Sequence, residues 1–221
     1  MNFYPTILTD SLELVQEQIN LVCSNKKIKT VQIDIIDGFF VDNLTITPMD
    51  LVDVKFHDLK IDFHLMTEEP LTFAEEIVNH GKYFPVRVVL GQIEKMSSQE
   101  DFISLLEDYN IMKGLSLDLY TPHEEILDSV FKRLDSLQLM SIEAGAQGHA
   151  FNDIIFKKIA AVKKRANKIN PHLEIIIDGG VKLSNIEKLV EAEVDSVGVG
   201  SAIWTSEDVN KTLERFCEYA N

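Results

Sequence analysis

Two carboxylates and a histidine stand near the ends of apolar, strand-like runs in this sequence. Asp34 lies near the end of one run, His64 lies near the end of a second, and Asp178 directly follows a third. The carboxyl ends of parallel strands meet at one edge of a sheet, so the three groups can converge there. Such a cluster suits either a divalent metal ion or proton transfer by paired acids and bases. The alternatives are a structural anchor for Asp34 and a hydrogen-bonded core residue for His64.

Gln32 joins this group by strand alternation, because residues 32 and 34 point to the same face of a strand. A buried amide beside a buried carboxylate is costly unless both find partners. The Asp37-Gly38 pair that follows is instead typical of a tight turn.

Two glycine-containing pairs near the end of the chain predict a phosphate site. Gly179-Gly180 comes directly after Asp178, and Gly200-Ser201 follows the last strand-like run. In eight-stranded α/β barrels the loops after strands seven and eight commonly hold phosphate through backbone N–H groups. The alternative is that both pairs form ordinary turns between strand and helix. A further loop, which contains Gly145 and Gly148, is a candidate to close over the ligand.

Strand-like and helix-like patterns alternate along the chain. The expected strands cover residues 3–8, 30–36, 61–65, 86–90, 114–117, 136–142, 174–177 and 196–199. The expected helices cover residues 12–23, 71–79, 101–109, 124–134, 153–167, 186–192 and 209–219. Most of the strands are short and apolar on both faces, as parallel strands buried on both sides are.

This alternation predicts an α/β fold in which residues 1–221 form a single (β/α)8 TIM barrel domain. A chain of 221 residues is slightly short for such a barrel but lies within the usual range. An open doubly wound sheet is the alternative. That fold would carry a glycine-rich turn after its first strand, where Thr9-Asp10-Ser11 stands.

Composition excludes several classes of partner. The chain has 36 acidic and 21 basic residues and a net charge of −15, which disfavours nucleic acid and anionic membranes. An anionic substrate must therefore be held by local dipoles rather than by the overall field. No apolar run approaches the roughly 18 residues of a membrane span, and a strand-like run begins almost at the N-terminus. We therefore expect a cytoplasmic protein without a signal peptide.

Several of these segments resemble the ribulose-phosphate 3-epimerase family, a group of phosphate-binding (β/α)8 barrels. Residues 32–43 are similar to its H-x-D-x-M-D-G-x-F-V-P-N signature in register, and His64-Leu65-Met66 matches H-L-M. Residues 140–148 are similar to its M-x-V-x-P-G-F-G-G loop. Residues 178–180 match D-G-G, and residues 200–203 match G-S-A-I. The resemblance runs the length of the chain.

The resemblance implies a sugar-phosphate 3-epimerase, an isomerase of pentose phosphate metabolism. Asp34 and Asp178 would be the acid and base that move the proton at carbon 3 of D-ribulose 5-phosphate, D-xylulose 5-phosphate or a related ketose phosphate, through an enediolate. A divalent metal (Zn, Fe or Mn), bound in the family by two histidines and two aspartates, would contact Asp34, His64 and Asp178 here. The implied substrate- and phosphate-binding residues are Thr9, Met66, Met140, Gly145, Gly148, Gly179, Gly180, Gly200 and Ser201. Family members often form homo-oligomers, which we also expect.

The departures from the family pattern fall mostly in the expected pocket. Gln32 stands where the family has its first histidine ligand, and an amide is a much poorer ligand for Zn²⁺ or Fe²⁺ than imidazole. Metal binding would then be weakened or absent. Ile36, Thr9-Asp10, Asp118-Leu119 and residues in 144–149 also differ from the family pattern.

Two other functions stay open. The first is a divergent family member that binds a sugar phosphate but lacks metal-dependent epimerase activity. The second is a phosphate-binding decarboxylase or aldolase, which usually places a lysine at a strand end. We find no inward lysine there, so this hypothesis ranks last.

Overall fold

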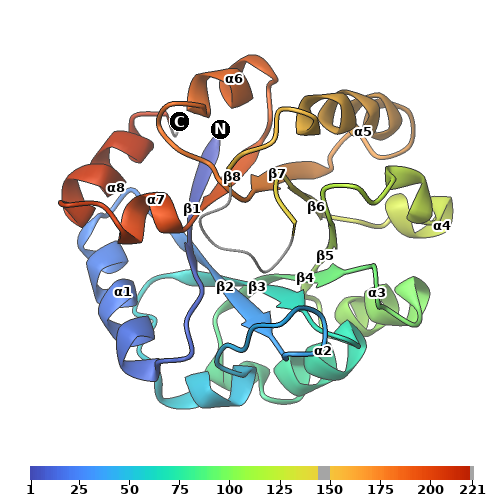
Figure 1. Ribbon diagram of the computed structural model, residues 1–221. Helices are drawn as coiled ribbons and strands as arrows, with labels where there is room; N and C mark the ends of the chain where they lie inside the picture. Colours follow the sequence, from blue (N-terminus) through green and yellow to red (C-terminus); the bar gives the residue numbers. More distant parts are fainter. Residues whose placement is uncertain (144–149, 220–221) are drawn as a thin grey trace.

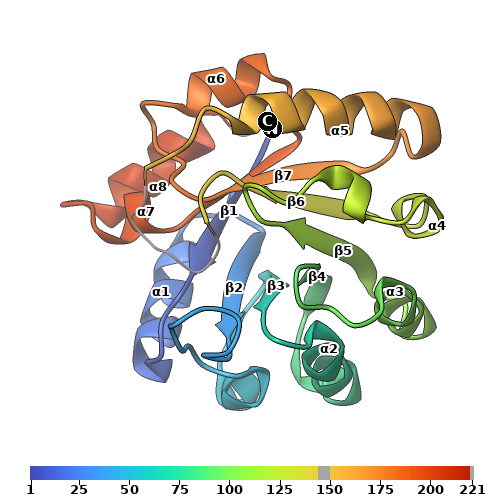
Figure 2. The same ribbon diagram turned by 45° about the vertical axis from the view of Figure 1, so that its right-hand side comes forward.

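Eight strands follow one another around a closed barrel, from β1 to β8, and each is parallel to its neighbours (Figure 1). This computed structural model describes residues 1–143 and 150–219. The helices form a ring outside the strands, as the two views in Figures 1 and 2 show. The predicted (β/α)8 architecture is confirmed.

All eight predicted strands are present, and none of their ends differs from the prediction by more than two residues. They are β1 (Asn2–Ile7), β2 (Thr30–Ile36), β3 (Lys60–Met66), β4 (Val86–Gln92), β5 (Met112–Leu117), β6 (Ser136–Met140), β7 (Glu174–Asp178) and β8 (Ser196–Val199). Short apolar runs rich in Ile, Leu and Val were sufficient to predict them, because both faces of a barrel strand are covered.

The helices match the prediction less closely. The α-helices are α1 (Leu12–Ser24), α2 (Pro70–Asn79), α3 (Gln99–Asp108), α4 (Asp128–Phe131), α5 (Ile155–Ile169), α6 (Ile186–Glu191), α7 (Ser201–Trp204) and α8 (Val209–Cys217). Three short 3₁₀ helices are η1 (Pro48–Asp53), η2 (Gly81–Tyr83) and η3 (His123–Glu125).

The predicted helix 124–134 is wrong in extent. Only η3 and α4 form there, and Leu127 between them has an extended backbone with ψ 141°. Arg165 of α5 donates hydrogen bonds to the carbonyl oxygens of His123 and Ile126. These tertiary bonds satisfy carbonyls that a continuous helix would otherwise pair, so the helix is interrupted.

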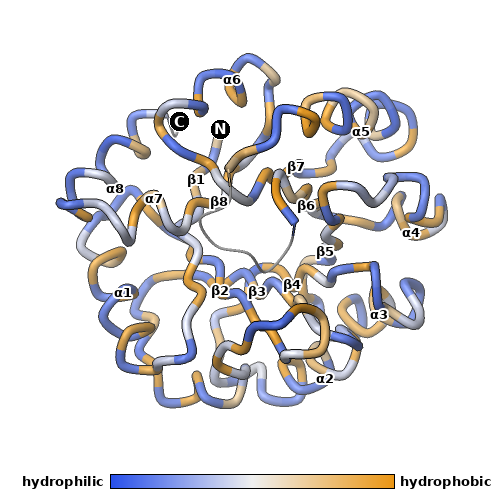
Figure 3. Tube along the Cα trace, in the orientation of Figure 1, coloured by the Kyte–Doolittle hydropathy of each residue, from blue (hydrophilic) through white to orange (hydrophobic). Residues whose placement is uncertain are grey.

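Strand alternation divides the core into two parts. Odd-numbered residues such as Ile33, Phe63 and Leu139 point outward and pack in one large apolar cluster under the helices. Figure 3 shows hydrophobic and hydrophilic stretches alternating along this helical ring. Even-numbered residues point into the barrel, where polar side chains are common.

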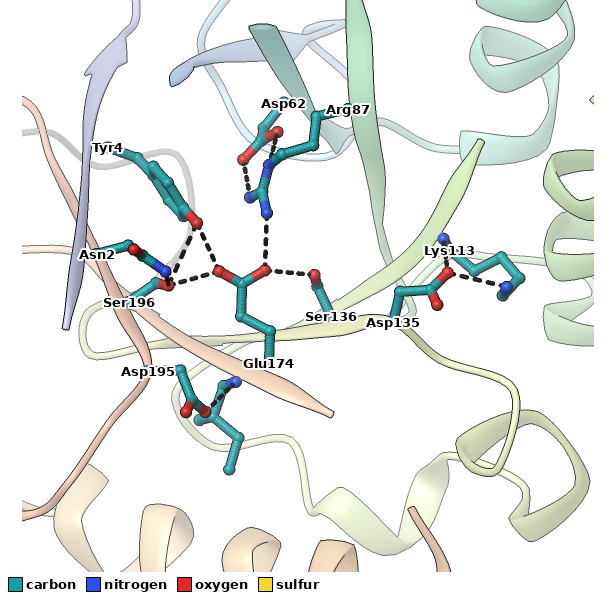
Figure 4. A network of polar contacts seen from close by, with 11 residues as sticks. Asn2, Tyr4, Asp62, Arg87, Lys113, Asp135, Ser136, Glu174, Asp195 and Ser196 are labelled. Atoms are coloured by element: carbon teal, nitrogen blue, oxygen red, sulfur yellow. Dashed lines mark hydrogen bonds and ion pairs between the residues drawn. The ribbon is translucent and has the colours of Figure 1, made fainter. Parts of the chain in front are cut away.

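The amino ends of the strands enclose a network of buried polar groups (Figure 4). Arg87 donates hydrogen bonds to both carboxylate oxygens of Asp62 and to Oε2 of Glu174, the last at 2.9 Å. Glu174 also accepts from the hydroxyls of Tyr4 and Ser136, at 2.6 and 2.8 Å, and from Ser196. A small apolar cluster lies next in the barrel and is composed of Tyr4, Val88, Leu90 and Ile176.

Among the described residues, no helix has the length and apolar character needed to cross a membrane.

Candidate active site

A pocket of about 480 Å³ lies at the carboxyl ends of the strands, opposite the Arg87 network. Asp34 of β2 and Asp178 of β7 both line it, although each is only 6% exposed. Its lining residues are Thr6, Leu8, Asp34, Met66, Met140, Ile142, Asp178, Gly179, Gly180, Val181, Gly198, Gly200 and Ser201. The structure therefore brings Asp34 and Asp178, the two residues expected to be the acid and base, to one pocket.

A glutamine amide joins the two carboxylates. Nε2 of Gln32 donates to Oδ1 of Asp34 at 2.9 Å and to Oδ2 of Asp178 at 2.7 Å. Gln32 is fully buried, and its Oε1 finds no partner among the described residues. The amide thus uses both of its N–H groups to hold two negative groups side by side.

His64 and a second buried glutamine complete the cluster. Nδ1 of His64 lies 3.2 Å from Oδ1 of Asp34 and 3.2 Å from Nε2 of Gln138, which comes from β6. Nε2 of Gln138 also lies 3.3 Å from Oδ2 of Asp178, with a longer contact of 3.6 Å to the sulfur of Met140. Nε2 of His64 and Oε1 of Gln138 are buried without a partner among the described residues.

The electrostatics of the site favour a shared proton. Burial, followed by repulsion from Asp34, raises the pKa of Asp178 to about 6. The positive form of His64, the hydrogen bond from Gln32 and the backbone N–H of Gly179 act in the opposite direction. Two nearby carboxylates whose environments differ can hold one proton between them near neutral pH.

Asp34, His64 and Asp178 also form a possible metal centre. One donor atom from each residue can be chosen so that all three lie within 4.8 Å of one another, and all three residues are buried. Two carboxylates and an imidazole suit Zn²⁺, Fe²⁺ or Mn²⁺, with coordination positions left open for a substrate. The cluster could therefore bind a divalent metal ion, whereas Gln32 turns its amide nitrogen rather than its oxygen toward these donors.

Glycines form one wall of the pocket. Gly179 and Gly180 have positive φ angles of 97° and 63°, which most other residues rarely adopt. A Cβ atom on Gly179 would lie 2.5 Å from Cγ1 of Ile142, so a side chain has no room there. Gly179, Gly180, Gly200 and Ser201 all line the pocket, and the N–H of Gly179 donates to Oδ1 of Asp178 at 2.6 Å.

Of the other residues predicted to bind the substrate, some line the pocket and some do not. Met66 and Met140 line the pocket and pack with Ile36 and Ile142 in a small apolar cluster. Thr9 does not line the pocket, and its hydroxyl oxygen accepts a hydrogen bond from the backbone of Ser11. Gly145 and Gly148 lie outside the described residues.

The sequence analysis missed several residues of the site. Gln138 is the most consequential, and it could have been found because it shares an inward face with Ser136 and Met140. Thr6 lines the pocket on β1 and is two residues from Tyr4, so the same alternation indicates it. Gly198 packs so closely on Asp178 that a Cβ there would lie 2.9 Å from Cγ of the carboxylate. None of the described residues that line the pocket is a lysine.

Comparison with known proteins assigns a family. The sequence profile of the Ribulose-phosphate 3 epimerase family matches residues 2–204. The ribulose-phosphate 3-epimerase of Helicobacter pylori (strain ATCC 700392 / 26695) is 30% identical over 217 residues, covering 97% of this chain and 95% of the relative. That of Buchnera aphidicola subsp. Baizongia pistaciae is 31% identical over 190 residues, covering 84% of this chain and 81% of the relative.

Solved structures support the same fold. Phosphoribosyl anthranilate isomerase from Thermus thermophilus aligns with a TM-score of 0.65 at 12% identity, covering 99% of this chain and 100% of that one. The 3-hexulose-6-phosphate synthase from Salmonella typhimurium aligns with a TM-score of 0.66 at 12% identity, covering 99% and 97%. At these identities the likeness establishes the barrel and no particular reaction.

Proposed function

The chain belongs to the ribulose-phosphate 3-epimerase family, and on that basis we propose that it inverts carbon 3 of a ketose phosphate, with D-ribulose 5-phosphate and D-xylulose 5-phosphate as the first candidates. The observation that carries the proposal is the pair of carboxylates, Asp34 and Asp178, in a pocket that also has a wall of glycines.

Epimerisation needs one group to remove the proton at carbon 3 and another to return a proton on the opposite face of the sugar. Asp34 and Asp178 come from β2 and β7, so they enter the pocket from different strands. The raised pKa of Asp178, caused first by burial and then by Asp34, lets this carboxyl take up and release a proton closer to neutral pH than an ordinary aspartate does. For each direction of the reaction the ionised group is the base and the protonated group is the acid.

The remaining parts of the pocket have roles consistent with this chemistry. Gly180, Gly200 and Ser201 would bind the substrate phosphate through backbone N–H groups and a hydroxyl, which suits a chain with a net charge of −15. Gly179 would leave room for the phosphate beside them, while its own N–H donates to Oδ1 of Asp178 at 2.6 Å. Met66 and Met140 would exclude water from the enediolate. A divalent cation held by Asp34, His64 and Asp178 would polarise the substrate's carbonyl group.

Solvent deuterium exchange tests the proposal directly. Purified protein is incubated in D₂O with D-ribulose 5-phosphate, and deuterium at carbon 3 is followed by NMR. We expect exchange with the unaltered protein and a loss of at least about 100-fold for Asp34→Asn and Asp178→Asn, since general acid–base groups typically contribute 10²–10⁴-fold.

Asp10→Asn is the matched control, because Asp10 is an exposed carboxylate that does not line the pocket. Exchange by this variant should equal that of the unaltered protein. Absence of exchange with every pentulose and hexulose phosphate tried would refute the epimerase proposal.

One observation favours a second candidate function. The bridge from Gln32 satisfies Asp34 and Asp178 within the protein, so a sugar phosphate could bind without turnover. Calorimetric binding of a ketose phosphate together with no deuterium exchange would favour this binding protein over the enzyme.

A further inference from the structure

The two buried glutamines face atoms of Asp34, His64 and Asp178, the three residues of the possible metal centre. Gln32 donates to Oδ1 of Asp34 and to Oδ2 of Asp178, at 2.9 and 2.7 Å. Gln138 faces Nδ1 of His64 and Oδ2 of Asp178, at 3.2 and 3.3 Å. One oxygen of each carboxylate and Nδ1 of His64 are thus each met by an amide nitrogen.

The contact at His64 excludes a metal ion from that nitrogen, because a neutral imidazole nitrogen has one lone pair at most. In one tautomer Nδ1 accepts the N–H of Gln138, and its lone pair is occupied. In the other tautomer Nδ1 carries the proton and donates it to Oδ1 of Asp34, which lies 3.2 Å away. Neither arrangement leaves Nδ1 of His64 free to bind a cation, so Gln138 must withdraw before that nitrogen becomes a ligand.

The amides approach the carboxylates from within the barrel. Gln32 and Gln138 are fully buried and do not line the pocket, whereas Asp34 and Asp178 do. A cation entering from solvent must therefore compete with amides that are already in place. Both amide oxygens are buried and have no partner among the described residues, which indicates that the nitrogens are oriented by their attraction to the carboxylates.

We propose that Gln32 and Gln138 cap the donor atoms of Asp34, His64 and Asp178, so that a divalent cation binds only when these amides withdraw. Gln32 and Gln138 are positioning residues that hold the two carboxylates and His64 in place without a metal. Their competition with the cation sets the metal affinity of the site. The inference builds on the site proposed above for catalysis.

Mn²⁺ binding measured without substrate tests the proposal. Purified protein is treated with a chelator and then titrated with MnCl₂, and free Mn²⁺ is measured by electron paramagnetic resonance. Methionine is close to glutamine in size but has no N–H group and is a poor ligand for Mn²⁺. We expect Gln32→Met and Gln138→Met each to bind Mn²⁺ more tightly, by about tenfold, because each frees charge-assisted hydrogen-bond acceptors.

Gln18→Met is the matched control. Gln18 is a buried glutamine of α1 whose Oε1 also lacks a partner among the described residues, and it does not line the pocket. Its replacement should leave Mn²⁺ affinity unchanged. If the Gln32 variant does not fold, as judged by circular dichroism, Gln138→Met carries the test alone.

Weaker binding by either folded variant would mean that the amide oxygens act as ligands, and unchanged binding would mean that the amides do not compete. Either result overturns the proposal. Because the titration contains no sugar phosphate, its failure is separate from that of the epimerase proposal, which deuterium exchange alone decides.

Discussion

Replacing Arg87 by methionine should destabilise the barrel, and the loss should grow with pH. Arg87 is the cation among two buried carboxylates at the amino ends of the strands, and its side chain is 18% exposed. Asp62, its bidentate partner, is not exposed at all. Breaking a buried ion pair by removing one member typically costs about 3–5 kcal/mol, and we expect this loss at pH 8.

The pH dependence follows from the titration of Asp62. Burial raises the pKa of Asp62 to about 6, although the hydrogen bonds and charge of Arg87 act to lower it. Without Arg87 that pKa must rise further. A carboxyl whose pKa is raised on folding makes the folded state lose stability as pH rises from the unfolded-state pKa to the folded-state pKa. In the unaltered protein this loss is complete near pH 6, whereas in Arg87→Met it continues above pH 6.

The cost of Arg87→Met in the free energy of unfolding should differ between pH 6 and pH 8. One pH unit corresponds to about 1.36 kcal/mol for a single titrating group, so the interval from pH 6 to pH 8 adds up to about 2.7 kcal/mol. The cost of Arg87→Met should therefore fall from about 3–5 kcal/mol at pH 8 to as little as about 0.3–2.3 kcal/mol at pH 6. Urea unfolding followed by circular dichroism at both pH values measures the difference.

Two further variants make the test specific. Asp62→Asn combined with Arg87→Met removes the titration of Asp62 and should leave only the part of the pH dependence that Glu174 contributes after losing Arg87. Arg133→Met is the surface control, because Arg133 is 30% exposed and pairs with Glu100 and Glu107. It should cost no more than about 1 kcal/mol at either pH. An equal cost of Arg87→Met at pH 6 and pH 8 would refute the reasoning.

Two other predictions concern the carboxyl end of the barrel. Gly198→Ala should slow deuterium exchange by about 100-fold, because a new Cβ 2.9 Å from Cγ of Asp178 must displace that carboxylate. Gly81→Ala is the control and should have no effect, because a Cβ at that position would have nothing within 4 Å. Normal exchange by Gly198→Ala would contradict the prediction. Burial lowers the pKa of Lys158 to about 8, with the negative charges of Asp118 and Glu94 opposing it. NMR of ¹³C-methylated protein should therefore show Lys158 titrating near pH 8, and a midpoint in the ordinary lysine range would be inconsistent with burial as the cause.

The local pattern of apolar and polar residues was sufficient to predict the strands and to predict that Gln32 and Asp34 share a face of one strand. Both depend on a side-chain period of two, which the sequence displays directly. The convergence of Asp34, His64 and Asp178 needed only the additional rule that parallel strands end at one edge. These parts of the fold and of the site were predictable because each depends on a short segment or on a general rule.

What could not be predicted depends on contacts between distant segments. The break in helix 124–134 is stabilised by Arg165, about 40 residues further along the chain. Strand alternation indicates that Gln138 of β6 points inward, but its contact with His64, 74 residues away, forms only when the barrel closes. Arg87 follows a register shift between β3 and β4 near Asp62, which no local pattern indicated.

Each end of the barrel interior holds two acidic side chains close together, and different groups stabilise the negative charge at each end. At the amino ends, Asp62 and Glu174 share the permanent positive charge of Arg87, and hydroxyl groups complete their hydrogen bonds. At the carboxyl ends, the neutral amide of Gln32 bridges Asp34 and Asp178, and no guanidinium contacts them among the described residues, although His64 lies 3.2 Å from Asp34. A guanidinium offsets buried negative charge permanently, whereas an amide leaves the negative charge uncompensated. The pair at the pocket must therefore take up a proton or a cation from outside, and this requirement makes it the reactive end of the molecule.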